Sequence, residues 1–289
     1  MSTLIISGIQ SSLHWEDKKA NLRMFEEKIF SIAQTEIVVL PEMFSTGFSM
    51  HPKNLSETMD GETMQWMKRI AAKKKIILTG SLIIKDFSTP LQSESELIQG
   101  TPVGGGEAFY NRLVWVLPNG EVGYYDKRHL FAYGDEDQHY APGEKRLIAS
   151  VKGWKINLLV CYDLRFPVWS RQSPPRPGEI GRGLEYDVLI YVANWPERRV
   201  QAWTTLLRAR AIENQCYVVG VNRTGEDGNK VQYPGESMAI DPIGEILYHE
   251  KHKEDIFTIT LDKSVLEKTR EKFPFWRDAD VFKIITNSE

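Results

Sequence analysis

The sequence predicts an α/β protein in which helices cover a central sheet or a pair of sheets. Short runs rich in Ile and Val recur along the 289 residues, and stretches with helical spacing separate several of them. Two turn-like segments between apolar runs add predicted hairpins. With 42% hydrophobic and 26% charged residues, the chain is long enough to bury a large core.

The first half of the chain alternates predicted strands and helices. Apolar residues recur at intervals of three and four within 22–32 and within 64–70, which places each set on one face of a helix. Asn119-Gly120 is a strong hairpin signal between the last two predicted strands of this half. The predicted strands here are 3–9, 37–40, 76–84, 109–117 and 121–125.

The second half continues the same alternation. Its predicted strands are 155–160, 187–193, 217–221, 238–240 and 245–248. A helix is expected between 203 and 215, and 241–244 joins the last two strands as a hairpin turn. The polar segments 85–107 and 173–183 interrupt the pattern and are predicted to be surface loops.

Composition excludes several classes of partner. The net charge of −3 and the pI near 6.1 provide no basic face for nucleic acid and no attraction to a membrane surface. The first apolar run is too short for a signal-peptide core, and with two cysteines a disulfide framework is not expected, so cytoplasmic residence is predicted. The six histidines show no HExxH spacing and no CxxC pair occurs, so no metal is expected.

Chemically capable side chains follow four of the predicted strands. Glu42, Cys161, Asn194 and Asn222 each stand at or just beyond the carboxyl end of a strand. Ligand sites of α/β sheets gather at these ends, because the loops there leave a rigid scaffold. A carboxylate, a thiol and two amides thus fall at similar places on the predicted strands.

These groups suit nucleophilic attack on an amide carbonyl. A cysteine reacts as its thiolate, so Cys161 needs a base, and Glu42 is the candidate. The oxyanion that develops needs a cation or N-H donors, for which Lys127 and the backbone N-H of Tyr162 are candidates. Spacing alone does not show that the four groups meet.

Each reactive residue also has a structural interpretation. A cysteine such as Cys161 is often simply a buried hydrophobe, and buried packing is the favoured interpretation of Cys216, which opens an apolar strand. His129 and His139 would permit a Cys-His hydrolase, but structural hydrogen bonding is favoured for both.

Three segments resemble the signature regions of the nitrilase, or carbon-nitrogen hydrolase, superfamily, in family order. They are Pro41-Glu42, the Asp-Lys-Arg-His-Leu-Phe segment 126–131 and the Cys-Tyr-Asp-Leu-Arg-Phe-Pro segment 161–167. The resemblance covers about residues 4–261. It implies a four-layer α-β-β-α sandwich of the nitrilase type, forming a single domain over 1–289, with a Glu42-Lys127-Cys161 triad and no cofactor.

The resemblance also suggests residues around the triad. Glu136, in the loop after the lysine, matches a second glutamate that holds Lys127 and helps to position substrate or water. Arg165 would bind a substrate carboxylate or pair with a structural acid, and the structural role is slightly favoured. Trp195 would form a pocket wall or pack at a strand end, with the choice left open. Asn194 is a further candidate for substrate binding.

Finer features resemble the bacterial omega-amidase group, which hydrolyses 2-oxoglutaramate and 2-oxosuccinamate. They are the segments 41–50, 127–131, 192–196 and 273–275, whereas 85–107 and 173–183 look like insertions relative to that group. For the substrate carboxylate, Arg198 and Arg199 are additional basic candidates. The alternatives are an N-carbamoyl amine or amino-acid amidohydrolase, a nitrilase, or a non-catalytic binding module on the same fold.

The resemblance further implies a homodimer. The segment 262–289 is expected to extend beyond the last strand and to lie at the dimer interface. Its aromatic run 273–276 would reach across the partner, because an exposed aromatic patch otherwise reduces solubility.

Overall fold

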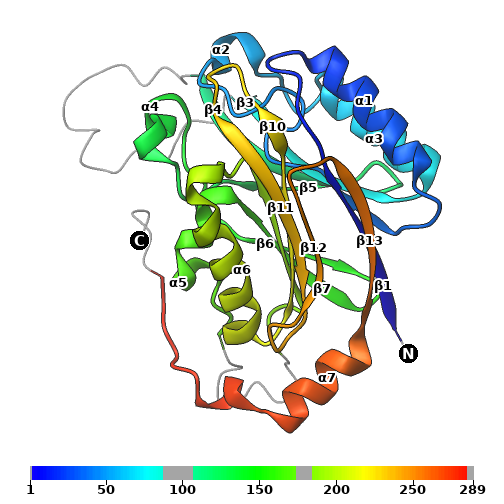
Figure 1. The fold of residues 1–289 in the computed structure, drawn as a ribbon, viewed down its shortest axis with the longest axis vertical. Helices are drawn as coiled ribbons and strands as arrows, with labels where there is room; N and C mark the ends of the chain where they lie inside the picture. Colours follow the sequence, from blue (N-terminus) through cyan, green and yellow to red (C-terminus); the bar gives the residue numbers. More distant parts are fainter. Residues whose placement is uncertain (1, 87–106, 174–183, 285–289) are drawn as a thin grey trace.

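In the computed structural model, which describes residues 2–86, 107–173 and 184–284, two β-sheets stack face to face between layers of helix (Figure 1). The helices α1 and α3 pack on one sheet, and α6 with the short α5 packs on the other, which confirms the predicted four-layer α-β-β-α sandwich. The two predicted loops 85–107 and 173–183 fall almost entirely outside the described residues.

The first sheet has six strands in the order β13-β1-β2-β3-β4-β5. The pairs β1-β2 and β2-β3 are parallel, and the remaining pairs are antiparallel. Its strands are β1 Thr3–Gln10, β2 Ile37–Val39, β3 Ile77–Asp86, β4 Ala108–Val116, β5 Val122–Asp126 and β13 Asp255–Asp262.

The second sheet has seven strands in the order β10-β11-β9-β8-β7-β6, with β12 also paired to β11. The central pairs β7-β8 and β8-β9 are parallel. Its strands are β6 Leu147–Val151, β7 Trp154–Val160, β8 Val188–Ala193, β9 Tyr217–Asn222, β10 Thr224–Glu226, β11 Gln232–Ile240 and β12 Ile246–Lys251.

Helices connect the strands and cover the outer faces of both sheets. The α-helices are α1 Lys18–Ser31, α2 Pro52–Leu55, α3 Glu62–Lys74, α4 Glu136–His139, α5 Pro167–Ser170, α6 Val200–Asn214 and α7 Lys263–Lys272. Short 3-10 helices are η2 Ala132–Gly134, η3 Cys161–Arg165, η4 Glu197–Arg199 and η5 Phe275–Asp278. None of the helices in the described residues combines the length and apolar character that a membrane crossing requires.

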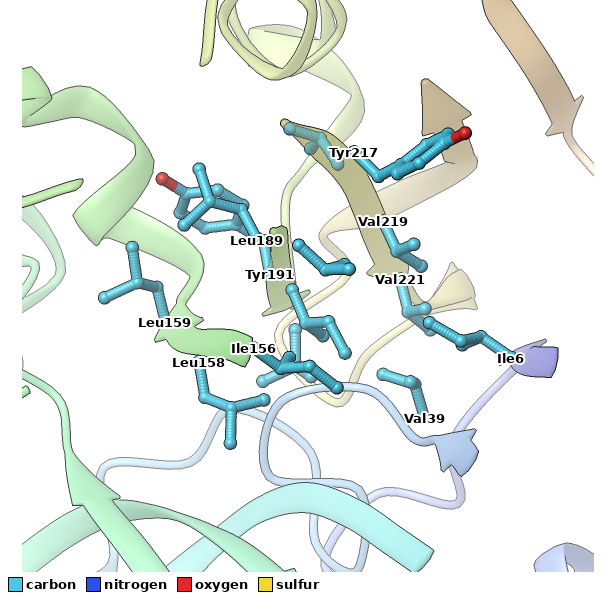
Figure 2. Packing of buried hydrophobic residues seen from close by; sticks show 14 of the residues in the cluster. Ile6, Val39, Ile156, Leu158, Leu159, Leu189, Tyr191, Tyr217, Val219 and Val221 are labelled. Atoms are coloured by element: carbon cyan, nitrogen blue, oxygen red, sulfur yellow. The ribbon is translucent and has the colours of Figure 1, made fainter. Parts of the chain in front are cut away.

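Strand alternation explains why the sheets are covered on both faces. In β2, Ile37 and Val39 point into the cluster between the sheets, whereas Val38 points into the cluster with Phe25 and Met67 under the helices. Figure 2 shows Ile6 and Val39 of the first sheet approaching the strands of the second. A strand that is buried on both faces is expected to be a continuous apolar run, as the sequence shows here.

The strands that the sequence analysis missed have recognisable reasons. β6, β10 and β13 lie outside the predicted runs, and β11 begins six residues before the predicted start at Met238. Pro234 and Gly235 gave the start of β11 the appearance of a loop, and a register shift lies between Gly235 and Ser237. The structure accommodates these residues in a bulged strand that pairs with β10 and β12.

Candidate active site

Three side chains from separate parts of the chain meet at one edge of the sandwich. Glu42 follows β2, Lys127 follows β5 and Cys161 directly follows β7. The Lys127 ammonium donates to Glu42 Oε1 at 2.9 Å and to Glu136 Oε2 at 2.8 Å, and the side chains of all three partners are fully buried. The structure therefore brings together residues that the sequence could place only near strand ends.

Asn111 in β4 completes the contacts around the two carboxylates. Its amide nitrogen donates to Glu42 Oε1 at 2.8 Å and to Glu136 Oε1 at 3.1 Å. The backbone N-H of Phe131 donates to Glu136 Oε2 at 2.7 Å. One lysine and one amide thus hold both carboxylates in fixed orientations, which suits a base that must act without reorganisation.

Glu42 also connects the two sheets. Its Oε2 accepts the backbone N-H of Asn194 at 2.8 Å, and the Asn194 side chain donates to the carbonyl of Glu42 at 2.5 Å. Because Glu42 follows a strand of the first sheet and Asn194 a strand of the second, the carboxyl ends of both sheets meet here. This is the arrangement that the strand-end argument predicted.

Electrostatics keep the resting thiol protonated. Burial raises the pKa of Cys161 well above its ordinary value, the charge of Glu42 raises it further, and Lys127 opposes both. Burial alone would lower the pKa of Lys127, but Glu136 and Glu42 raise it above its ordinary value. Burial and the charge of Glu42 raise the pKa of Glu136 against the opposing effect of Lys127. Cys161 therefore needs a base to react at neutral pH.

The turn after β7 presents the thiol. Cys161 has φ 44°, a left-handed conformation that is unfavourable for a residue with a side chain. Asp163 stabilises this turn, because its carboxylate accepts the N-H of Val160 at 3.0 Å, the N-H of His129 at 3.0 Å and the hydroxyl of Tyr125 at 2.8 Å. The contacts of Asp163 offset the strain at the nucleophile.

A cavity of about 180 Å³ opens over Cys161. This is smaller than the roughly 300 to 1,000 Å³ of pockets for drug-sized ligands, so it suits a small substrate. Aromatic, apolar and basic side chains line it together with two amides and one carboxylate: Phe48, Met50, Lys127, Phe131, Tyr162, Arg165, Asn194, Trp195, Pro196, Arg198, Arg199, Asp227, Asn229, Val231 and Tyr233.

Residues 6–271 match a family model described as carbon-nitrogen hydrolase. The chain belongs to the carbon-nitrogen hydrolase family. This confirms the family that the three motifs predicted.

Relatives within this family span nearly the whole chain. An omega-amidase, YafV of Escherichia coli, is 41% identical to this chain. The match covers 98% of this chain and 100% of that protein. A 2-oxoglutaramate amidase of Bacillus subtilis is 30% identical, with 94% of this chain covering 96% of that protein.

Solved structures of this superfamily share the fold. XC1258 of Xanthomonas campestris, a CN-hydrolase superfamily protein described with an arsenic adduct in its active site, is 40% identical with a TM-score of 0.86. The match covers 98% of this chain and all of that one. Nit3 of Saccharomyces cerevisiae, a nitrilase superfamily member, is 25% identical with a TM-score of 0.75, and 94% of each chain is covered.

Within this carbon-nitrogen hydrolase, the structure revises the interpretation of Arg165. The sequence slightly favoured a structural ion pair, but within the described residues Arg165 pairs with no carboxylate. Its guanidinium lies 5.0 Å above the ring of Trp195, and both residues line the cavity. Trp195 therefore contributes to the pocket wall, although it is also well packed, with its indole N-H donating to the carbonyl of Arg199 at 2.7 Å.

The remaining predicted residues divide between pocket and scaffold. Tyr162 lines the cavity and packs edge to face against Phe131. His129 makes the expected structural hydrogen bond, with Nδ1 2.8 Å from Asp163 Oδ1. The same expectation was wrong for His139, which is exposed at the end of α4, where its ring is free to be solvated.

Sequence reasoning missed several residues around the site, and Asn111 is the most informative. With Arg112 it interrupts the apolar run of β4, and a buried polar residue in such a strand signals a hydrogen-bonding partner. Asp227 and Tyr233 gave no comparable signal, because they lie in a turn-rich segment that reads as a loop.

Proposed function

We propose that this protein is an omega-amidase that hydrolyses the terminal amide of short 2-oxo acid amides, such as 2-oxoglutaramate and 2-oxosuccinamate, to the acid and ammonia. The observation that carries the proposal is the convergence of Glu42, Lys127 and Cys161 at the base of a small cavity with arginines on its wall. The 41% identity to an omega-amidase over nearly the full chain supports this choice of substrate.

The first half of the proposed reaction forms a thioester. Glu42 takes the proton of the Cys161 thiol as the sulfur bonds to the amide carbon. Lys127 and the backbone N-H of Tyr162 stabilise the oxyanion of the tetrahedral intermediate. Glu42 then returns the proton to the nitrogen, the C-N bond breaks, and ammonia leaves.

The second half hydrolyses the thioester. Glu42 takes a proton from water as the water oxygen attacks the acyl carbon, and the second oxyanion uses the same donors. The proton then passes to the departing sulfur of Cys161, which restores the thiol and releases the acid. Glu136 holds Lys127 throughout and helps to position the substrate or the water.

The substrate is held at both ends in this proposal. The Asn194 amide oxygen is buried and has no hydrogen-bond partner among the described residues, so it suits the N-H groups of the scissile amide. Arg165, stacked on Trp195, is the carboxylate-binding candidate, because a guanidinium fits a carboxylate with two parallel hydrogen bonds. Arg198 and Arg199 add positive charge to the wall.

We further propose a cytoplasmic homodimer with one domain per chain. The segment 262–289 would lie at the interface, since Phe275 and Val281 are each 64% exposed there. Phe275 and Phe282 line a surface groove with Pro167 and Val168 of α5. Light scattering at micromolar concentration tests this, and a monomer would contradict it.

A panel of ammonia-release assays tests the substrate. The value of kcat/KM for 2-oxoglutaramate or 2-oxosuccinamate should exceed that for glutamine, asparagine, N-carbamoyl amino acids and simple nitriles by about tenfold or more, which corresponds to ~1.4 kcal/mol of differential transition-state binding. Equal turnover of a carbamoyl compound or a nitrile would replace the omega-amidase proposal by one of those activities. If iodoacetamide modifies no cysteine selectively and the protein turns over none of these compounds, the protein would be a binding module.

A further inference from the structure

Two of the segments that line the pocket come from different sheets. Phe48 and Met50 lie on the loop that follows β2 of the first sheet. Asp227, Val231 and Tyr233 lie on the β10-β11 hairpin of the second sheet. The separation of these two wall segments decides how wide an acyl group fits over the nucleophile.

The indole of Trp15 fills the space between two glycines, one in each wall segment. A Cβ built on Gly228 would lie 2.4 Å from both Cδ1 and Nε1 of Trp15, and one built on Gly47 would lie 3.1 Å from its Cε3. The five-membered ring therefore contacts the hairpin and the six-membered ring contacts the loop. The two segments approach Trp15 this closely only because neither glycine has a side chain.

Hydrogen bonds attach the segment that carries this indole to both wall segments. The N-H of Glu16 donates to the carbonyl of Thr46 at 2.8 Å, and the Ser49 hydroxyl donates to the Glu16 carboxylate at 2.5 Å. On the other side, the N-H of Thr224 donates to the carbonyl of Ser11 at 3.1 Å. These bonds fix the indole relative to both walls.

The Asp227 carboxylate connects the turn of the hairpin to its pocket-lining residues. The Asp227 carboxylate accepts the N-H of Asn229 at 2.8 Å, the N-H of Val231 at 3.0 Å and the hydroxyl of Tyr233 at 2.9 Å. A shift at Gly228 is therefore transmitted to the side chains that face the cavity. Strand β10, with three residues, lies at the edge of its sheet and adds little restraint.

We propose that Trp15 is a positioning residue that sets the width of the pocket by holding the loop 43–50 and the hairpin 224–233 at a fixed separation. It thereby limits the enzyme to amides with small acyl groups. The inference rests on the proposed function only for the choice of substrate, because pocket width also controls the access of thiol reagents to Cys161.

Kinetics of Trp15→Ala and Trp15→Phe test the proposal. For the better of the two 2-oxo acid amides, Trp15→Ala should raise KM about tenfold and change kcat less than about threefold, since the triad is untouched. The kcat/KM for an aryl-substituted amide relative to the short amide should rise. Trp15→Phe, which keeps a six-membered ring, should have a KM between those of the wild type and Trp15→Ala. A loss of kcat/KM that came entirely from a lower kcat, with KM unchanged, would overturn the proposal.

A matched pair of glycine variants provides the second test. Gly228→Ala should raise KM, because its new methyl overlaps the indole, and Trp15→Ala should remove this effect in the double variant. Gly123→Ala, in another hairpin, is the control, because its Cβ would lie at an ordinary 3.5 Å from Leu147. Additive effects of Gly228→Ala and Trp15→Ala on KM would contradict a direct contact.

A readout without substrate separates this inference from the proposed function. The rate of Cys161 alkylation by N-phenylmaleimide, relative to iodoacetamide, should increase severalfold in Trp15→Ala. If that ratio rises but the wild type hydrolyses no 2-oxo acid amide, the proposed function fails and the inference stands. If the wild type is active and the ratio is unchanged in Trp15→Ala, or in Trp15→Phe where circular dichroism shows Trp15→Ala unfolded, the inference fails.

Discussion

The two cysteines are both free and buried, and burial raises the pKa of both thiols, yet their surroundings differ. Cys161 is 9% exposed at the base of the cavity, whereas Cys216 is fully buried where β9 begins. The charges of Glu42 and Lys127 act on the first thiol. The charges of Arg270, Asp187 and Glu213 act on the second thiol, whose Sγ lies 3.9 Å from the carbonyl of Arg210.

This difference teaches that burial does not identify a nucleophile. Both thiols are protonated at neutral pH, so neither is reactive by itself. In the proposed mechanism, Cys161 differs in having a carboxylate that takes its proton, a cation that stabilises the oxyanion, and an opening for the substrate. Each of the following variants removes or adds one of these differences.

Loss of the sulfur at the two positions should give the largest contrast. Cys161→Ala should lower turnover by about 10⁴-fold or more, because no thioester can form. Cys216→Ala should keep nearly the wild-type kcat. Ammonia release measures both, and appreciable turnover by Cys161→Ala would contradict the thioester mechanism.

Loss of either charged neighbour of Cys161 should lower turnover without removing the sulfur. Lys127→Ala removes the cation at the oxyanion and should lower kcat by ~10² or more. Glu42→Gln keeps the shape but removes the base and should be comparably damaging. Steady-state kinetics provide the measurement. Near wild-type turnover in either variant would refute the role proposed for that residue.

Alkylation by iodoacetamide should respond to the same two variants in opposite directions. The pKa of Cys161 is raised by burial and by Glu42 and lowered by Lys127, so Glu42→Gln lowers this pKa and Lys127→Ala raises it. At neutral pH the thiolate fraction, and hence alkylation, should increase in Glu42→Gln and decrease in Lys127→Ala. In the wild type the rate should still be rising at about pH 8.5, the pKa of a free thiol.

Mass spectrometry locates the label for this prediction. Cys161 should be modified, with protection by substrate, while Cys216 remains unmodified in the folded protein. Faster labelling of Lys127→Ala than of the wild type would show that the charges act in some other way.

The smallest effect should come from Cys216→Ser, on stability alone. The new hydroxyl would be buried in the apolar cluster around β9, which costs about 1 to 3 kcal/mol when its hydrogen bond is poor. Thermal unfolding should therefore shift downward while kcat and KM stay unchanged. A change in KM would show that the packing of this region is coupled to the pocket.

Much of the architecture could be predicted from periodicity, because the central strands are buried and their sequences are therefore mostly apolar. Strands β7, β8 and β9 are mostly apolar and buried, and each was predicted to within one residue of its bounds. The edge elements were harder, since β10 and the start of β11 contain glycine and proline. Their strand geometry comes from pairing with neighbours rather than from local preference.

The site divides along the same lines. Strand ends located Glu42, Cys161 and Asn194, and the family motifs identified Lys127 and Glu136. The loop and hairpin that line the rest of the pocket could not be predicted, because the contact of Trp15 with Gly228 joins residues more than two hundred positions apart. No local pattern records such a contact, and only the assembled sandwich creates it.

The bonds between Glu42 and Asn194 give the active site a second use, as an indicator of assembly. The proposed base, Glu42, follows a strand of one sheet, and the proposed nucleophile, Cys161, follows a strand of the other. A molecule in which the sheets have separated therefore retains all its strands and has no catalytic centre. In a denaturant titration, ammonia release would register the docking of the two halves before circular dichroism registers the loss of either.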